Sequence, residues 1–298
     1  MKKIVAQAIH NNIRLDKFLC REFNISFDFS QKVIREKKVK VNNNKIEPSY
    51  KIKAGDEINI FTSLEKRNEK EKIKPPISQE KIKKFFSFKI FEDNNILVID
   101  KPSGLAVQGR SLKEPSIDDF IYQINKQNPK NKLFLVHRID RDTSGILILA
   151  KTRESAAFLS ECFKNKTIKK TYLALVCGDI KKVNGQINIP LIKKVVNKIE
   201  KVYPDLTLGK EAISNYKVVK KYDNYCLVEL NPITGRTHQL RVHCKEIGHP
   251  IVNDFKYGGK KSKIIPDIER LCLHAYSIAI DNYYGKKLEI KTPNPVFF

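Results

Sequence analysis

Charged side chains crowd one short stretch of the chain, HRIDRDTSG at residues 137–145. Two arginines and two aspartates follow a histidine there, and a Thr-Ser-Gly turn separates them from the apolar run Ile146–Ala150. An apolar run bounded by turn residues is typical of a strand buried on both faces. Loops at the edge of such strands often hold catalytic groups on a rigid scaffold. A salt-bridged surface turn is the alternative for this cluster taken alone.

Two other clusters carry residues suited to related chemistry: KKTYLAL with Tyr172, and GRTHQLRVH with Arg236 and Arg241. A buried carboxylate stays ionised near neutral pH when a cation lies beside it, and arginine supplies that charge without losing its own. An aspartate–arginine pair next to a tyrosine, in a basic protein, fits attack on or near an electrophilic carbon of a nucleotide. Composition alone does not select this combination over others.

The net charge indicates a polyanionic partner. The 298 residues include 57 Lys and Arg against 33 Asp and Glu, which gives a formal charge of +24. Distributed Lys and Arg favour nucleic acid, because binding releases the counterions of the phosphates. An anionic membrane is the alternative, but we find no long basic amphipathic helix, no apolar stretch of about 18 residues and no signal-peptide core. We therefore expect a nucleic-acid-binding protein without a membrane span.

The cysteines and histidines favour structural roles over a metal site. Six scattered cysteines without a CxxC pair predict reduced thiols in a cytoplasmic protein: Cys20, Cys162, Cys177, Cys226, Cys244 and Cys272. The spacing of His238 and His243 falls within the range of zinc sites. Such sites normally add a CxxC-type pair, which is missing here. We expect packed or hydrogen-bonded histidines and no metal.

Residues 13–60 form a first predicted unit of two basic helices followed by short strands. Leu15, Phe18 and Leu19 have helical spacing, and Ser30 is the expected cap of a second helix with Val33 and Ile34 inward. Strands are expected at 39–41 and 57–60. A merely solvated basic face is one interpretation of this unit, and RNA contacts are the other. The candidate RNA contacts are Arg14, Lys17, Arg21, Arg35, Lys37 and Lys38.

A charged linker is expected at residues 61–85. It contains eight Lys and Arg against four Glu, with two prolines in the middle, and such a composition buries little apolar surface. The predicted domains are therefore 1–60, with its core at 13–60, the linker 61–85, and a larger domain at 86–298.

The larger domain is predicted to combine short strands with a few helices. Helices are expected at 116–127 and 153–165, and residues 236–243 open a helix or a strand. Strands are expected at 96–100, 146–150, 169–176, 186–192, 212–219, 225–230, 277–280 and 288–290. This order indicates an α+β fold on a mixed or antiparallel sheet.

Four motifs in order resemble the pseudouridine synthase family that modifies large-subunit ribosomal RNA and some tRNA. They are DKPSGLAVQG, HRIDRDTSGILILAKT, TYLALVCG and GRTHQLRVHCKEIGHPIVNDFKYG, and the resemblance covers essentially all of residues 90–290. Residues 13–60 are similar to the S4 RNA-binding domain, which matches the ribosomal branch, and AVQG with VHRIDRDTSG further resembles its C type. The chain departs from the family at Ile139, where Leu is usual, and at Gln108-Gly109, where His-Gly is usual.

The resemblance implies a catalytic set. The family's catalytic aspartate falls on Asp140, its tyrosine on Tyr172 and its motif arginine on Arg241. Asp140 would begin cleavage of the uridine C1′–N1 bond, as a nucleophile at C1′ or a base at C2′, and Arg241 would hold it charged and oriented. The uracil would rejoin through C5 without a cofactor. Arg138 would fill the space left by the flipped base, and we expect Asp142 to cap the following turn.

The implied activity is isomerisation of uridine to pseudouridine in 23S ribosomal RNA, free or in a pre-ribosomal particle, by a cytoplasmic monomer. A tRNA-modifying enzyme of the same fold is one alternative, and a non-catalytic ribosome-assembly factor is another. A zinc-dependent base deaminase would also flip its base, but the Cys/His zinc set that it needs is missing.

Overall fold

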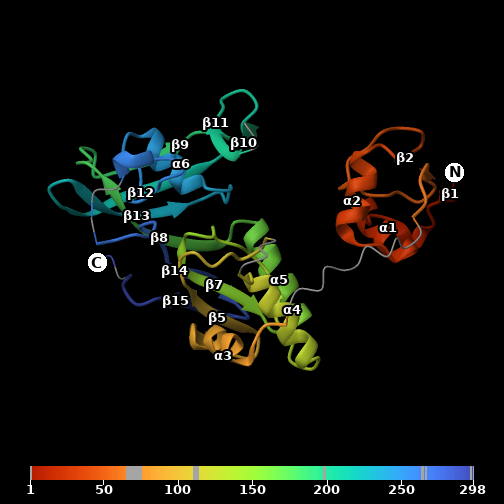
Figure 1. The fold of residues 1–298 in the computed structure, drawn as a ribbon, viewed down its shortest axis with the longest axis horizontal. Helices are drawn as coiled ribbons and strands as arrows, with labels where there is room; N and C mark the ends of the chain where they lie inside the picture. Colours follow the sequence, from red (N-terminus) through yellow and green to blue (C-terminus); the bar gives the residue numbers. More distant parts are fainter. Residues whose placement is uncertain are drawn as a thin grey trace. The chain divides into compact units, whose positions relative to one another are not determined.

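Separate apolar cores divide the chain into two units, Met1–Pro75 and Pro76–Phe298 (Figure 1). The computed structural model describes residues 2–64, 76–109, 114–196, 199–262, 265, 267–295 and 297. Most of the expected linker, residues 65–75, lies outside the described residues. Each unit is considered by itself.

The first unit packs two helices on a small antiparallel sheet with strand order β1-β3-β2. Its elements are β1 Lys2–Val5, the 3-10 turn η1 Ala8–His10, α1 Leu15–Phe23, α2 Phe27–Arg35, β2 Val39–Val41 and β3 Glu57–Ile60. The predicted core positions Leu15, Phe18 and Leu19 are buried on α1, and Val33 and Ile34 are buried on α2. The two helices and two strands expected in this unit are confirmed, and β1 adds a strand that was not expected.

The cap expected for α2 was wrong. Ser26 is the N-cap, and its side chain accepts a hydrogen bond from the backbone N–H of Phe29. Ser30 lies one turn inside the helix, fully buried, and its hydroxyl donates to the carbonyl of Phe27. Ser26 lies directly before Phe27, and Ser30 lies three residues before Val33. Either spacing suits an N-cap, so the sequence does not distinguish the cap from a buried serine that bonds back to its own helix.

A mixed, mainly antiparallel sheet forms the second unit, as predicted. Among the described residues it has ten strands, eight of them in the order β4-β5-β7-β14-β8-β13-β12-β9, with β6 on β7 and β15 on β14. The strands are β4 Lys89–Glu92, β5 Ile96–Lys101, β6 Phe134–Leu135, β7 Ser144–Ala150, β8 Ile168–Cys177, β9 Asn184–Asn188, β12 Ile213–Lys221, β13 Tyr225–Pro232, β14 Leu273–Tyr283 and β15 Lys286–Lys291. Of the strands that the structure describes, only β7 and β14 pair in parallel.

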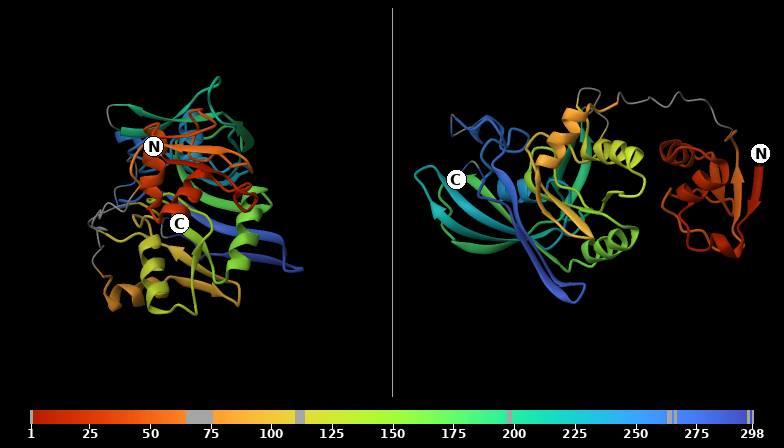
Figure 2. Two further views of the ribbon diagram at one scale, coloured as in Figure 1. Left: turned by 90° about the vertical axis from the view of Figure 1, so that its right-hand side faces the viewer. Right: turned by 90° about the horizontal axis from the view of Figure 1, so that it is seen from below.

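Helices cover the two ends of this sheet. The helices α3 Gln79–Ser87, α4 Ile117–Gln127 and α5 Arg153–Lys164 share one core with β5 and β7. The helix α6 Gln239–Glu246 shares a second core with β8 and β13. Figure 2 shows the strands side by side, with α4 and α5 near the β5–β7 part of the sheet. The second unit also contains the short turn η2 Gly259–Ser262.

The helix α3 and a hairpin of two strands were not expected from the sequence. The helix α3 occupies the end of the range predicted as linker, where Ile82 is 7% exposed and Phe85 fully buried. The second unit therefore begins before Phe86. A separate antiparallel hairpin, β10 Leu191–Val196 and β11 Ile199–Pro204, follows β9. None of the described helices is long and apolar enough to span a membrane.

Candidate active site

The loop with the clustered charges lies between β6 and β7, and β7 anchors it. Every residue of β7 is buried, as the apolar run predicted. His137, at the start of the loop, accepts a hydrogen bond through Nε2 from the backbone N–H of Ile148, at 2.8 Å. Its ring stacks on Phe163, with 4.4 Å between centroids. Burial, with a smaller effect of Lys170, lowers the pKa of His137 to about 3, so the ring remains an acceptor.

A second loop, residues 101–105 of the DKPSGLAVQG motif, is bonded to the first. The fully buried Lys101 donates through Nζ to the carbonyls of Pro102, Leu105 and Arg141, at 2.8–2.9 Å. Three carbonyls match the three N–H groups of an ammonium, although burial lowers its pKa to about 7. Ser103 donates to the carbonyl of Asp142 at 2.6 Å. These bonds fix the backbone on the C-terminal side of Asp140.

Asp140 is a mostly buried carboxylate with cationic neighbours. Its side chain is 19% exposed. Burial raises its pKa above the usual value, while the charges of Arg241 and Arg138 and the backbone N–H of His238 lower it. The exposed Asp142 adds a smaller effect that raises it. A carboxylate in such a place is more basic and more nucleophilic than one in water, and the arginines still favour its charged form.

Arg241 lies in α6 with its side chain 5% exposed. It makes a bidentate pair with Asp254: Nε donates to Oδ2 at 2.8 Å and Nη2 to Oδ1 at 2.7 Å. Arg241 was expected to hold Asp140 charged and oriented. The hydrogen bonds of its side chain go to Asp254, and it acts on Asp140 through charge. Asp254 is fully buried and orients the arginine. Sequence reasoning missed it, although it lies in the quoted VNDFKYG motif.

Tyr172 occupies the centre of the sheet. It lies on β8, paired with Leu230 of β13 on one side and Ala275 of β14 on the other. Its ring packs against both cores of the unit. Burial and then the charge of Asp140 raise its pKa above the usual value, which places its hydroxyl within the electrostatic reach of the carboxylate and keeps the phenol protonated.

The turn after Asp140 is held differently from the prediction. The N–H of Thr143 donates to the carbonyl of Asp140 at 3.2 Å, and the side chain of Asp142 is exposed. The backbone of Asp140, and not the Asp142 carboxylate, thus closes the turn. Arg138 is exposed on the other side of Asp140. Ile139, where the family usually has Leu, is 6% exposed in the core.

Two more groups beside Asp140 escaped the sequence reasoning. His238 precedes α6, and its Nε2 lies 4.0 Å from Oδ1 of Asp140. The hydroxyl of Tyr257 lies 2.6 Å from Nδ1 of His238. For His238 we expected a packed or hydrogen-bonded histidine and no metal, without a place beside Asp140. The signal for its role is its position in the same short motif as Arg241.

Histidines elsewhere in the second unit have ordinary partners. His243 bonds to Ser214 and to the carbonyl of Ile189, at 3.0 and 3.2 Å. His274 lies between Ser144 and Thr292, at 2.8 and 2.7 Å. Within the described ranges, no group of three or more His, Cys, Asp or Glu side chains is arranged to hold a metal.

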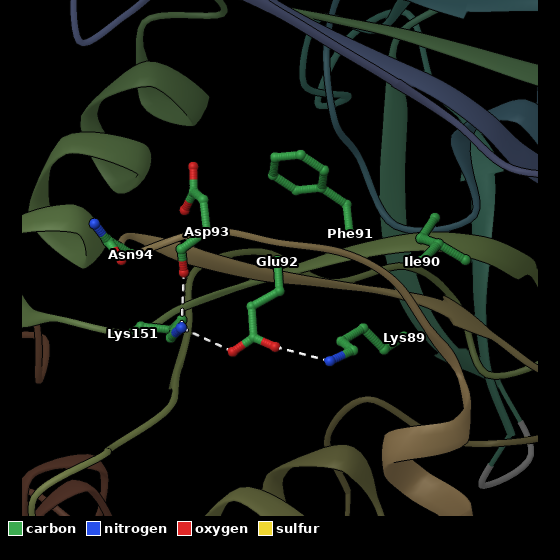
Figure 3. A pocket seen from close by; sticks show the side chains of 7 residues that line it. All are labelled: Lys89, Ile90, Phe91, Glu92, Asp93, Asn94 and Lys151. Atoms are coloured by element: carbon green, nitrogen blue, oxygen red, sulfur yellow. Dashed lines mark hydrogen bonds and ion pairs between the residues drawn. The ribbon is translucent and has the colours of Figure 1, made fainter.

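The charged side chains that line a shallow pocket at the β4–β5 turn have partners within the protein (Figure 3). Lys151 donates to Glu92 and to the carbonyl of Asp93, both at 2.7 Å, and Lys89 donates to Glu92 at 3.0 Å. The Asp93 carboxylate accepts hydrogen bonds from Tyr283 and from two backbone N–H groups. These bonds stabilise the turn.

The other predicted RNA-binding residues belong to the first unit. Lys17, Arg21, Arg35, Lys37 and Lys38 are exposed there. Arg14 differs, because its guanidinium binds the fully buried Asp16 at the start of α1, at 2.6 Å.

Comparison with known proteins matches both units. Residues 95–246 match the family model described as RNA pseudouridylate synthase, and residues 13–58 match the S4 domain. The "Ribosomal large subunit pseudouridine synthase C" of Vibrio parahaemolyticus is 38% identical over 94% of this chain and 89% of its own. The protein of that name from Rickettsia felis is 38% identical over 96% and 94%.

Solved structures agree with the sequence match. "Human RNA Pseudouridylate Synthase Domain Containing 4" superposes with a TM-score of 0.61 at 25% identity, over 74% of this chain and 93% of its own. "Human RNA Pseudouridylate Synthase Domain Containing 1" gives 0.58 at 27% identity, over 70% and 83%. The sequence match, the shared fold and the mostly buried Asp140 point to the same conclusion. The chain belongs to the RNA pseudouridylate synthase family.

Proposed function

We propose that this protein converts uridine to pseudouridine in large-subunit ribosomal RNA, with Asp140 as the group that begins the reaction. The observation that supports this most is the carboxylate itself, 19% exposed and held by two bonded loops. Arg138 and Arg241 keep its charged form accessible. The two curated relatives named above carry this activity and substrate in their names.

The chemistry follows from where the charges lie. In the nucleophilic route, an Asp140 oxygen bonds to C1′ while the C1′–N1 bond breaks and the uracil leaves with its electron pair. The uracil turns, C5 attacks C1′, the ester bond to Asp140 breaks and the C5 proton is lost. In the alternative route, Asp140 removes the C2′ proton while the C1′–N1 bond breaks, which gives a glycal. The proton returns from Asp140 to C2′ as C5 bonds to C1′, and the C5 proton is lost. In the nucleophilic route C1′ gains positive charge in the transition state, which the carboxylate stabilises.

Tyr172 and Arg241 take supporting roles in this scheme. The protonated, partly buried phenol of Tyr172 offers a ring on which the uracil can stack. Arg241, oriented by Asp254, stabilises the negative charge of Asp140 between turnovers. The target base must leave its stack to reach Asp140, at a cost of a few kcal/mol. The exposed Arg138 is placed to fill the space that it leaves.

The first unit supplies RNA affinity in this proposal. Its exposed cations are suited to phosphate contacts: Lys17, Arg21, Arg35, Lys37 and Lys38. Arg14 is better explained as the partner of Asp16. A cytoplasmic monomer that acts without a cofactor fits this scheme.

The test is the variant Asp140→Asn. We expect tritium release from large-subunit RNA labelled at uridine C5 to fall to background, with RNA affinity largely retained, because the amide has the shape of the carboxylate but neither its charge nor its basicity. Asp142→Asn is the matched control, since that exposed carboxylate should leave activity nearly unchanged. Tritium release by Asp140→Asn at the wild-type rate would disprove the role of Asp140.

Mapping of pseudouridines in a strain without this protein separates the alternatives. Loss at positions in large-subunit rRNA supports the proposal, and loss confined to tRNA supports a tRNA enzyme of the same fold. Unchanged pseudouridine in both RNAs, together with defective ribosome assembly, supports a non-catalytic assembly factor.

A further inference from the structure

His238 and Tyr257 lie beside Asp140 and have no role in the reaction as described above. His238 precedes α6 in a left-handed conformation, φ 52° and ψ 19°. A residue with a side chain adopts this conformation only at an energetic cost, which the surrounding structure must compensate. In this conformation the backbone N–H of His238 lies close enough to the Asp140 carboxylate to lower its pKa, and the ring lies between Asp140 and Tyr257.

The hydrogen bonds of Tyr257 favour one position for the ring proton of His238. The hydroxyl oxygen of Tyr257 accepts from the backbone N–H of Val202 in β11, at 3.2 Å. Its own proton is then the one available for Nδ1 of His238, 2.6 Å away. If Nδ1 accepts this proton, a neutral ring carries its hydrogen on Nε2. That nitrogen is the one 4.0 Å from Asp140.

Electrostatics favour the same arrangement. Burial and four nearby cations lower the pKa of His238 to about 3, so the ring is neutral. The cations are Arg241, Lys256, Arg138 and Lys193. Burial raises the pKa of Tyr257 to about 12, so the phenol keeps its proton. With the hydrogen on Nδ1, the lone pair of Nε2 would face the carboxylate and repel it. With the hydrogen on Nε2, an N–H dipole faces the carboxylate and stabilises its charge.

Tyr257 also contacts the other ion pair of the site. Its ring lies over the guanidinium of Arg241, with the guanidinium carbon 5.2 Å from the ring centroid. Its backbone N–H donates to Oδ1 of Asp254 at 3.2 Å. The hydroxyl of Tyr257 is the part that hydrogen-bonds to His238. The ring meets the imidazole edge to face, with 5.5 Å between centroids, and the ring and backbone also contact Arg241 and Asp254.

We propose that Tyr257 is a positioning residue whose hydroxyl holds His238 with its hydrogen on Nε2, directed at Asp140. His238 in turn supports the ionised carboxylate of Asp140, while Asp254 holds the guanidinium of Arg241. The catalytic consequence rests on the function proposed above, but the position of the hydrogen does not.

The first test measures the hydrogen directly and needs no RNA. Two-bond ¹⁵N–¹H correlation spectra of protein labelled in histidine distinguish the two neutral forms of the ring, and His238→Asn assigns the signal among the six histidines. We expect His238 to carry its hydrogen on Nε2, and Tyr257→Phe to shift it partly or wholly to Nδ1. A hydrogen on Nδ1 in the wild type, or a spectrum unchanged by Tyr257→Phe, would overturn the proposal.

The second test follows the consequence for catalysis. Tyr257→Phe keeps the ring over Arg241 and the backbone bond to Asp254, so it removes only the hydroxyl. We expect kcat to fall about tenfold, the usual effect of one lost hydrogen bond, with RNA affinity unchanged. Tyr225→Phe on β13 is the control and should retain the wild-type kcat. A wild-type kcat for Tyr257→Phe contradicts a catalytic consequence.

Substitutions of His238 separate the ring N–H from the backbone conformation. Gln places an N–H donor near the position of Nε2, whereas Asn is too short but tolerates the left-handed backbone better. We expect His238→Gln to retain more activity than His238→Asn. The opposite order would show that the backbone conformation matters and the ring N–H does not. If the wild type itself releases no tritium from RNA, the proposed function fails, and the spectra still decide the position of the hydrogen.

Discussion

The carboxylate of Asp140 is mostly buried, and burial favours its neutral form. Burial raises its pKa, and two arginines partly reverse that effect, Arg241 more than Arg138. Arg241 is already bound to Asp254, so removing its charge would disturb a buried pair as well as Asp140. Arg138 is exposed. Its charge can be removed with less damage to the fold, which makes it the better probe of Asp140.

Arg138→Gln should move the acid limb of the pH–rate profile to higher pH. The proposed reaction needs the Asp140 carboxylate, so the single-turnover rate falls as pH decreases through its pKa. Loss of the Arg138 charge raises that pKa further, and the fall then begins at a higher pH. The measurement is the rate at saturating RNA against pH. Arg153→Gln on α5 should leave the limb in place, and a limb that moves to lower pH would refute this account of the charge balance.

The residues that sequence reasoning missed have partners distant in the chain. Asp254 is 13 residues from Arg241, and Tyr257 is 19 residues from His238. No helical or strand period relates these positions, and only the turn after α6 brings them together. Asp140, Tyr172 and Arg241 were identified because the family resemblance covers their motifs, since the residues alone left the choice of chemistry open.

At the scale of elements, the site depends on how β7 meets β14. These strands pair in parallel at Ser144 with His274 and at Gly145 with Ala275. Gly145 has φ +106°, and a Cβ added there would meet the carbonyl oxygen of Ala275 and lie 2.6 Å from its nitrogen. Glycine is therefore required at this position both for its conformation and for the close approach of the backbones. The loop of Asp140 ends at this junction.

Gly145→Ala should destabilise the second unit by about 3 kcal/mol or more, because conformational strain and a clash with backbone act together. Gly285→Ala is a matched control: its φ is +83° and a Cβ there has no neighbour within 4 Å. We expect about 1–2 kcal/mol from strain alone for Gly285→Ala. Urea unfolding of both variants checks the difference. Equal losses would show that the close approach to Ala275 is unimportant.

Elements with strong apolar patterns were predicted well, and polar ones were not. The strands β5, β7, β8 and β13 and the helices α4 and α5 lie within a few residues of the predicted ranges. In the hairpin β10–β11, two lysines and two valines of β10 are exposed alike, so apolar and charged residues do not alternate, and the strand predicted at 186–192 reached only its first two residues. The helix α6 is buried on nearly all sides, which hides the 3.6-residue period and left helix and strand undecided.

At the scale of the whole molecule, charge and chemistry are distributed over two units. The first 75 residues carry 18 Lys and Arg against 10 Asp and Glu, and the remaining 223 carry 39 against 23. Both units are basic, so both should contribute to RNA binding. All of the residues proposed for the chemistry lie in the second unit. The boundary of the second unit matters, because α3 belongs to the core of that unit although the sequence of α3 is as charged as a linker.

Two truncated proteins test this division. Residues 76–298 keep α3, and residues 86–298 lose it together with the buried side chains of Ile82 and Phe85. We expect 76–298 to unfold cooperatively, and 86–298 to be less stable by about 3–5 kcal/mol, the burial free energy of two large apolar side chains.

The same proteins report on RNA binding and chemistry. Because 76–298 lacks the cations of the first unit, its affinity for rRNA and the slope of log affinity against log salt should both decrease. Its single-turnover rate at saturating RNA should be retained, since Asp140, Tyr172 and Arg241 keep their positions. Filter binding between 50 and 200 mM salt, about the range over which phosphate contacts dominate, measures the slope. An unchanged slope would mean that the second unit alone makes the phosphate contacts and that the first unit serves another purpose.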